Sequence, residues 1–203
     1  MNILIAQPKL EQELKQLEAE LHAHPEADIF LFPEGYLNQN IEQARELAQQ
    51  YGKIIISGHK RPKDRVLIIN ADGEIVMDRA KYDRTEIVEV NGLLISSMLC
   101  DELVLQGMCD IARTPISFIV HPIGVGMFSE EQYDEWINEA KKIAADYKTL
   151  VIGTSHADGS YRGSAVSIPI AYCISETGDE VFLSANDVRT RIMNLETREV
   201  TIV

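Results

Sequence analysis

The chain has 203 residues, of which 45% are hydrophobic, and its 19 Lys and Arg against 32 Asp and Glu give a formal net charge of -13. A chain of this length can bury one large core, and no break in composition marks a second unit, so we expect a single domain over residues 1–203. The negative charge repels phosphate backbones and anionic lipid surfaces. Nucleic acids and membranes are therefore not the expected partners.

The three cysteines, Cys100, Cys109 and Cys173, lack the paired spacing that disulfide frameworks and metal sites use. The sequence starts with a strand-like run at residues 2–7 that has no features of a signal peptide, and no apolar run approaches the roughly 20 residues needed to cross a bilayer. We therefore expect a cytoplasmic protein with reduced thiols. Five histidines without ligand spacing predict no metal.

Short apolar runs alternate with amphipathic stretches in the first part of the chain, a pattern typical of parallel strands joined by crossover helices. The strands are predicted at residues 2–7, 28–33 and 53–58, and the helices at residues 11–22 and 40–51. This part of the sequence is therefore a β-α-β-α-β unit.

The same order of elements recurs after the middle of the chain. Strands are predicted at residues 93–100, 117–122 and 149–153, and helices at residues 101–113 and 130–147. In the second of these helices, five side chains recur at the spacing of a buried face: Trp136, Ile137, Ala140, Ile143 and Ala144. The two halves of the sequence therefore predict two copies of one architecture.

A hairpin-like pair of segments follows each unit. Residues 65–70 and 74–82 are joined through Ala71-Asp72-Gly73, and residues 164–173 and 180–184 through Glu176-Thr177-Gly178-Asp179. Pairs of Asp and Gly supply the positive φ that such turns need. Two mixed sheets with helices outside would pack face to face, so we expect an α/β protein that forms a four-layer α-β-β-α sandwich.

Three of the predicted strands lead to side chains that can take part in catalysis. Residues 29–32 lead to Glu34, residues 74–80 lead to Lys81, and residues 93–99 lead to Cys100. Ligands of open α/β sheets collect at the carboxyl ends of the strands. A carboxylate, an amine and a thiol at three strand ends favour a thiol hydrolase over an inert core cysteine.

Each of these groups has an expected role. Cys100 precedes a predicted helix, whose N-terminal dipole is expected to lower the thiol pKa and make it a nucleophile. Glu34 would take the thiol proton and return it to a leaving amine. Lys81 and the backbone N–H of Asp101 would stabilise an oxyanion.

Phe32-Pro33-Glu34, Arg79-Ala80-Lys81 and Leu99-Cys100-Asp101 resemble, in order and context, the Glu-Lys-Cys triad of the nitrilase superfamily of carbon-nitrogen hydrolases. Residues 118–122 and 161–165 are similar to later segments of that family, so the resemblance covers nearly the whole chain. It implies the α-β-β-α sandwich and attack on amides, carbamoyl groups or nitriles through a cysteine thioester. It also implies a small-molecule amide substrate, no cofactor and a homodimer formed through outer helices.

The chain also departs from that family. The segment between Lys81 and Cys100 is short, so the loop that often carries a second active-site glutamate is cut back, and Glu86 and Glu89 are the nearest substitutes. Asp101 and Glu102 place two carboxylates beside the thiol, which raise its pKa unless they point away or pair with cations. The substrate cannot be deduced from the resemblance.

His121 and Gly124 lie after the strand that follows Cys100, and we expect them at the substrate pocket. Residues 124–129 have the position of a dinucleotide loop but lack its third glycine, so we expect them to border the pocket. Ser155-His156-Ala157-Asp158 is not expected to form a relay, because neighbours along a strand point to opposite faces. Cys109 and Cys173 are expected to be inert core residues.

Two other functions remain open at this stage. The short loop and the acidic neighbours of Cys100 also fit a non-catalytic binding or regulatory protein of the same fold. A different cysteine hydrolase would instead use His121 or His156 as its base. The favoured hypothesis is hydrolysis of a C–N bond in a small amide or carbamoyl compound.

Overall fold

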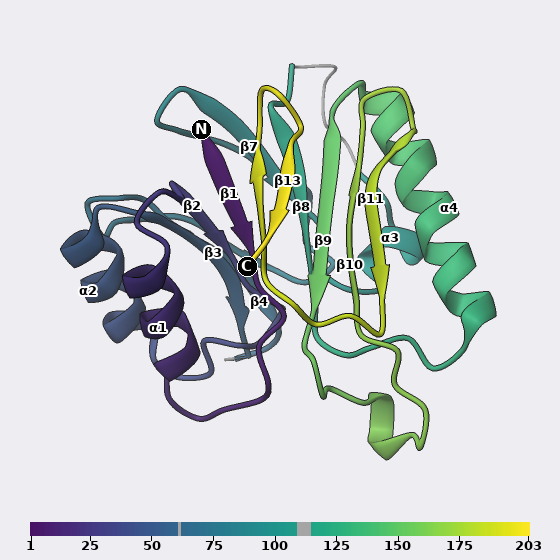
Figure 1. Ribbon diagram of the computed structural model, residues 1–203, viewed down its shortest axis with the longest axis horizontal. Helices are drawn as coiled ribbons and strands as arrows, with labels where there is room; N and C mark the ends of the chain where they lie inside the picture. The colour runs from purple at the N-terminus through teal and green to yellow at the C-terminus, as the bar shows by residue number, and fades with distance from the viewer. Residues whose placement is uncertain (61, 109–114) are drawn as a thin grey trace.

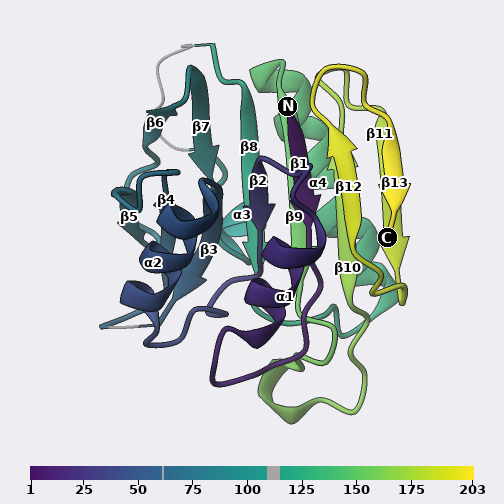
Figure 2. The same ribbon diagram turned by 60° about the vertical axis from the view of Figure 1, so that its left-hand side comes forward.

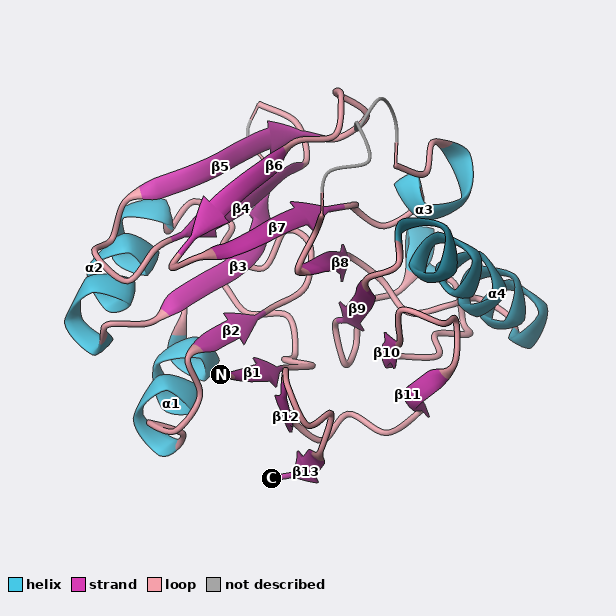
Figure 3. Cartoon of the chain, turned by 90° about the horizontal axis from the view of Figure 1, so that it is seen from above, coloured by secondary structure: helices cyan, strands magenta, loops and turns pink. Residues whose placement is uncertain are grey.

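The computed structural model describes residues 1–60, 62–108 and 115–203. Two mixed β-sheets pack face to face, and helices cover the outer face of each sheet (Figure 1). The view from above shows the four layers, with α1 (Lys15–Ala23) and α2 (Ile41–Tyr51) on one side and α3 (Glu102–Leu105) and α4 (Glu130–Tyr147) on the other (Figure 3). The predicted α-β-β-α sandwich is confirmed.

The first sheet has seven strands. Its spatial order is β13 (Val200–Ile202), β12 (Arg191–Asn194), β1 (Asn2–Ile5), β2 (Ile29–Leu31), β3 (Ile54–His59), β4 (Arg65–Ile69) and β5 (Ile75–Ala80). The pairs β1/β2 and β2/β3 are parallel and the other pairs are antiparallel. Figure 2 shows β12 and β13 beside β1 at one edge.

The second sheet has six strands. Its spatial order is β11 (Glu180–Ala185), β10 (Ile170–Ile174), β9 (Leu150–Ser155), β8 (Phe118–Ile123), β7 (Leu93–Ser97) and β6 (Ile87–Val90). Here β7, β8 and β9 are parallel and the outer pairs are antiparallel. Read from β6 to β11, the second sheet has the same sequence of parallel and antiparallel pairs as the first sheet read from β12 to β5. The predicted repetition of one architecture is therefore confirmed.

Three apolar clusters hold the layers together. One lies between the sheets and takes side chains from both, one lies between the first sheet and helices α1 and α2, and one lies between the second sheet and α4. The parallel strands are buried on both faces, which explains their uninterrupted apolar sequences. The shared middle layer fixes the strand ends of one sheet against those of the other.

Some predicted boundaries differ from the structure. The helix expected over residues 101–113 is short, because α3 covers Glu102–Leu105 and ends before Gly107, which has a positive φ. Residues 109–113 lie outside the described part, and so does the prediction for Cys109. The strand expected from residue 164 begins only at Ile170, after a 3₁₀ turn at Tyr161–Gly163.

Three strands were not predicted. Of these, β6 leads into β7 through Asn91 and Gly92, both with positive φ, and an Asn-Gly pair is a strong hairpin signal that would have located it. The other two, β12 and β13, extend the first sheet beside β1. In the described part of the chain, no helix is both long and apolar enough to cross a membrane.

Candidate active site

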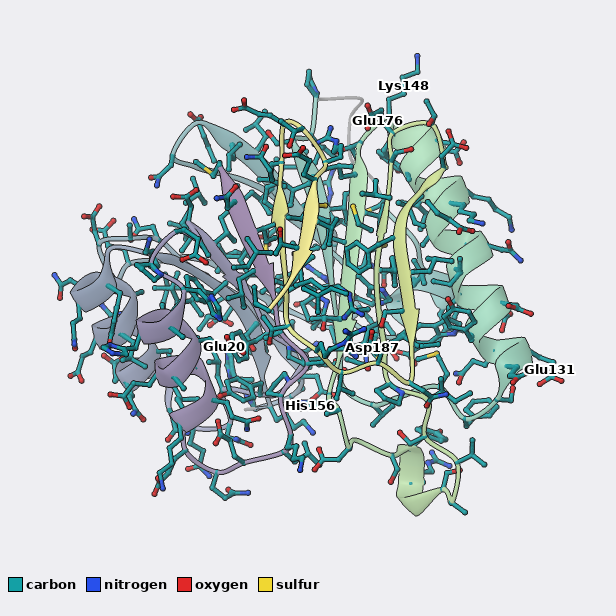
Figure 4. All side chains as sticks on the ribbon, viewed as in Figure 1. Glu20, Glu131, Lys148, His156, Glu176 and Asp187 are labelled. Carbon is teal, nitrogen blue, oxygen red and sulfur yellow. The ribbon has the colours of Figure 1, made fainter. Side chains whose placement is uncertain are left out.

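Glu34, Lys81 and Cys100 follow three strands that end at one edge of the sandwich. Glu34 follows β2, and Lys81 follows β5, which runs in the same direction because two antiparallel pairings separate it from β3. Cys100 follows β7 in the other sheet. Figure 4 labels His156, which follows β9 at this lower edge of the molecule and contacts the carbonyl of Glu34 through Nε2 at 3.3 Å.

The Lys81 ammonium lies between two carboxylates. Its Nζ is 3.0 Å from Glu34 Oε1 and 2.9 Å from Asp101 Oδ1. The other Asp101 oxygen accepts a hydrogen bond of 2.8 Å from the Tyr82 hydroxyl. Lys81 is therefore held from both sides, while its side chain remains 13% exposed. It can present a charge to a ligand without moving.

Burial and charge tune this cluster. Desolvation raises the pKa of Glu34, partly offset by Lys81, so this carboxyl is a better base than an exposed glutamate. Burial disfavours the charged form of Lys81, but Cys100, Glu34 and Asp101 outweigh it and raise the pKa of Lys81. Burial would also raise the pKa of Asp101, yet bonds from Lys81 and Tyr82 lower it. Lys81 is thus a permanent cation between Glu34, whose pKa is raised, and Asp101, whose pKa is lowered.

The expected lowering of the thiol pKa is wrong. Desolvation, followed by the negative charge of Glu34, raises the pKa of Cys100 to about 12, although Lys81 and a hydrogen bond from the Gly124 N–H oppose the shift. A helix of four residues is too short to reverse it. The resting group is a neutral thiol, which needs a base when it attacks. Cys173, the other described cysteine, is buried in the core as predicted.

Gly124 lies against both Glu34 and Cys100. Its backbone N–H faces the Cys100 sulfur, and a Cβ at this position would lie 2.8 Å from Glu34 Oε2. A side chain here would therefore displace the carboxylate. The structure brings Gly124 to the cluster, which is where the sequence placed it.

A second ion pair joins the segments that carry Lys81 and Cys100. Arg79 and Glu102 are both 1% exposed and form two parallel hydrogen bonds of 2.8 and 2.7 Å. Glu102 also accepts from the N–H of Tyr82 at 2.5 Å and of Leu99 at 2.6 Å. It thus ties the residue after Lys81 to the residue before Cys100. Both acidic neighbours of the thiol are thus paired with cations, Asp101 with Lys81 and Glu102 with Arg79, yet Asp101 still contributes to the raised pKa of Cys100.

Other predicted site residues lie elsewhere. His121 is fully buried beneath Cys100, with Nε2 2.7 Å from the Cys100 carbonyl oxygen and Nδ1 on the Tyr172 hydroxyl, so it does not line an open pocket. Glu86 and Glu89 are exposed, and the ion pairs of Lys81 are with Glu34 and Asp101. The carboxylate that accompanies Lys81 is Asp101 instead. Tyr82 and Tyr172 had no local signal in the sequence.

Similar structures identify the fold. The amidase from Nesterenkonia sp. AN1, solved as a variant with the acetamide moiety of fluoroacetamide added at its active-site cysteine, matches with a TM-score of 0.80 at 11% identity, over 95% of this chain and 89% of that chain. The chain has the fold of a nitrilase-superfamily amidase. A carbon-nitrogen hydrolase from Helicobacter pylori G27 matches with a TM-score of 0.77 at 14% identity, over 98% and 90%. No protein-family profile and no curated protein matches the sequence.

Another structure of the Nesterenkonia protein, a variant of its cysteine described as an amidase from the nitrilase superfamily, matches over 95% of this chain and 89% of that one at a TM-score of 0.79 and 10% identity. Because the alignments cover nearly all of each chain, the whole nitrilase fold is present here. Identities of 10–14% carry the arrangement of strands and helices. The chemistry must be argued from the side chains.

Proposed function

We propose that this protein hydrolyses a C–N bond in a small amide or carbamoyl compound through a thioester on Cys100. The observation that carries the proposal is the Lys81 ammonium, which lies 3.0 Å from Glu34 while its charge acts on the Cys100 thiol. A base, a cation and a nucleophile delivered by three separate strands exceed what packing requires. The neighbouring nitrilase-fold amidases support the same reaction class.

In the first half of the reaction, the sulfur of Cys100 attacks the carbonyl carbon of the substrate while Glu34 accepts the thiol proton. A C–S bond forms, and the carbonyl oxygen becomes an oxyanion. Lys81 and the backbone N–H of Asp101 stabilise this charge. Collapse of the intermediate breaks the C–N bond, and the proton on Glu34 passes to the leaving amine.

In the second half, water attacks the thioester. Glu34, again a carboxylate, takes a proton from the water. The C–S bond then breaks to release a carboxylic or carbamic acid, and Glu34 returns its proton to the sulfur to restore the thiol. The raised pKa of Glu34 suits both directions of transfer, because it makes the carboxylate a stronger base while the protonated form can still donate. The raised pKa of Cys100 requires this base at the moment of attack.

The test is ammonia release from a panel of small amides and carbamoyl compounds, together with intact-protein mass. We expect turnover with at least one compound and an acyl adduct on the protein. Both should disappear in Cys100→Ala and persist in the matched control Cys173→Ala, which changes a buried cysteine in β10 of the second sheet. An adduct that survives Cys100→Ala would refute the proposal.

The non-catalytic alternative makes a different prediction. If an amide raised the melting temperature without any Cys100-dependent turnover, the fold would serve binding alone. A histidine base has less support, because both ring nitrogens of His121 contact groups other than the thiol, and His156 contacts the carbonyl of Glu34. Retained activity in Glu34→Gln would restore that alternative.

A further inference from the structure

A histidine and a tyrosine form a buried chain of hydrogen bonds that ends on the backbone of the nucleophile. The side chains of His121 and Tyr172 are fully buried. The Tyr172 hydroxyl lies 2.5 Å from His121 Nδ1, and His121 Nε2 lies 2.7 Å from the Cys100 carbonyl oxygen. A carbonyl only accepts, so Nε2 carries the proton, Nδ1 accepts and the hydroxyl donates. Burial lowers the pKa of His121 to about 4, which keeps the ring neutral, as this series of hydrogen bonds requires.

Three adjacent strands build this contact. His121 of β8 and Tyr172 of β10 are both direct neighbours of Gly153 on the central strand β9. A Cβ at Gly153 would lie 2.4 Å from the Tyr172 ring, so only glycine lets the ring lie across β9 and reach the histidine. The ring centroids of the two residues are 6.0 Å apart. The glycine thus makes room for a polar pair inside an apolar sheet.

The backbone held by this pair is in an unfavourable conformation. Cys100 has a φ of 45°, in the left-handed region that a side chain with a Cβ seldom adopts. Such residues are strained and persist when their surroundings fix them. Here the Cys100 N–H donates to the carbonyl of Pro122 at 3.0 Å, and its carbonyl accepts from His121 and, at 3.3 Å, from the N–H of Leu103.

We propose that the His121–Tyr172 pair is a positioning device for the nucleophile, holding the Cys100 carbonyl and so the turn that directs the thiol toward Glu34 and Lys81. The inference rests on the proposed function and deepens it. Because the peptide between Cys100 and Asp101 is planar, fixing its carbonyl also fixes the direction of the Asp101 N–H. One buried pair therefore sets the sulfur and the backbone donor to the oxyanion together.

A purely structural pair would not need these atoms. An apolar pair would fill the same space, whereas a buried hydroxyl or imidazole left without a partner destabilises the fold. In this chain of bonds, the last acceptor is the backbone of the residue proposed to react. Neither side chain touches substrate, so the pair acts through Cys100.

The experiment compares His121→Leu, which removes the donor, with His121→Gln, whose side-chain amide can donate from nearly the same place. Three quantities are measured: kcat and KM on the best amide of the panel, the rate at which iodoacetamide alkylates Cys100 at pH 9, and the melting temperature. Tyr172→Phe keeps the ring and removes the hydroxyl. Tyr147→Phe is the matched control, because the Tyr147 hydroxyl bonds the carbonyl of Met108 instead.

We expect His121→Leu to lower kcat by roughly tenfold to a hundredfold with KM within about threefold, since the loss falls on the transition state. Alkylation of Cys100 should slow by about tenfold as the thiol loses its fixed direction. His121→Gln should recover most of both rates at a melting temperature similar to that of His121→Leu. Tyr172→Phe should lie between them, and Tyr147→Phe should match the parent protein.

Wild-type kcat and alkylation in a folded His121→Leu protein would overturn the inference. Equal losses in His121→Leu and His121→Gln that follow the melting temperature would overturn it as well. If His121→Leu does not fold, Tyr172→Phe decides, and an unchanged alkylation rate there counts against the pair. A parent protein without amide turnover would refute the proposed function, but the alkylation rates would still test the positioning.

Discussion

Two ion-pair clusters lie side by side in this protein and differ in how completely they are satisfied. Arg79 and Glu102 are almost wholly buried, and both Glu102 oxygens accept two hydrogen bonds each. Two residues further along, Lys81 is partly exposed between Glu34 and Asp101. In the first cluster both Glu102 oxygens are fully used and only the buried Arg79 Nε has no hydrogen-bond partner among the described residues, whereas the second keeps a base and a cation available. A cluster of charges is therefore not in itself a reactive site. It becomes one when some of its charged groups can still bond to a ligand.

The same substitution in the two clusters should have opposite consequences. Glu34→Gln removes the base but keeps the shape, and we expect kcat to fall by about 10²- to 10⁴-fold, the usual contribution of general acid–base catalysis. The melting temperature should change little, because the raised pKa of Glu34 shows that burial already disfavours its charge. Steady-state kinetics and a thermal melt on one preparation measure both. A fall in stability as large as the fall in activity would remove the distinction.

Glu102→Gln should instead cost stability. Breaking one partner of a buried ion pair typically costs about 3–5 kcal/mol, because the other charge stays buried. Arg79 would lose its bidentate partner, and the N–H groups of Leu99 and Tyr82 would lose a strong acceptor. Urea unfolding measures the change. The matched control Glu139→Gln breaks an exposed pair with Lys142 and should have almost no effect.

An unfolding free energy for Glu102→Gln equal to that of the parent protein would contradict a structural role for the Arg79–Glu102 pair. A protein that kept its stability but lost activity would mean that Glu102 takes part in the chemistry. Urea unfolding and steady-state kinetics of Glu102→Gln give both results.

The pH dependence of Cys100 alkylation tests the cluster of Glu34, Lys81 and Asp101 beside the thiol. Since the pKa of Cys100 is raised to about 12, its thiolate fraction should increase about tenfold per pH unit, or about a hundredfold between pH 7 and pH 9. A small free thiol approaches its plateau near the upper end of this range. Glu34→Gln removes a negative charge that raises the thiol pKa, so its profile should shift to lower pH. A plateau for the parent protein near pH 8 would mean an activated thiolate and a different mechanism.

The sequence predicted what depends on local pattern. Apolar runs ending in Glu34, Lys81 and Cys100 correctly placed these three residues together, because strands of known direction deliver their last residues to one edge. The thiol pKa was predicted in the wrong direction, since it depends on burial and on Glu34, which lies far away in sequence. Tyr172 was missed for the same reason. Its partner is set by the register of three strands across Gly153, which no local pattern reveals.

The smallest expected effect concerns the hydrogen bond from Tyr82 to Asp101, beside Lys81. Tyr82→Phe removes the hydroxyl that donates to Asp101 at 2.8 Å, but Lys81 still holds the other oxygen of that carboxylate. Tyr82 is 52% exposed, so water replaces the lost donor, and we expect kcat to fall by less than about tenfold with stability nearly unchanged. Tyr161→Phe, at another exposed tyrosine, is the matched control for kinetics and melting. A loss as large as that of Glu34→Gln would mean that Asp101 needs both supports, and that the cluster is closed on this side as well.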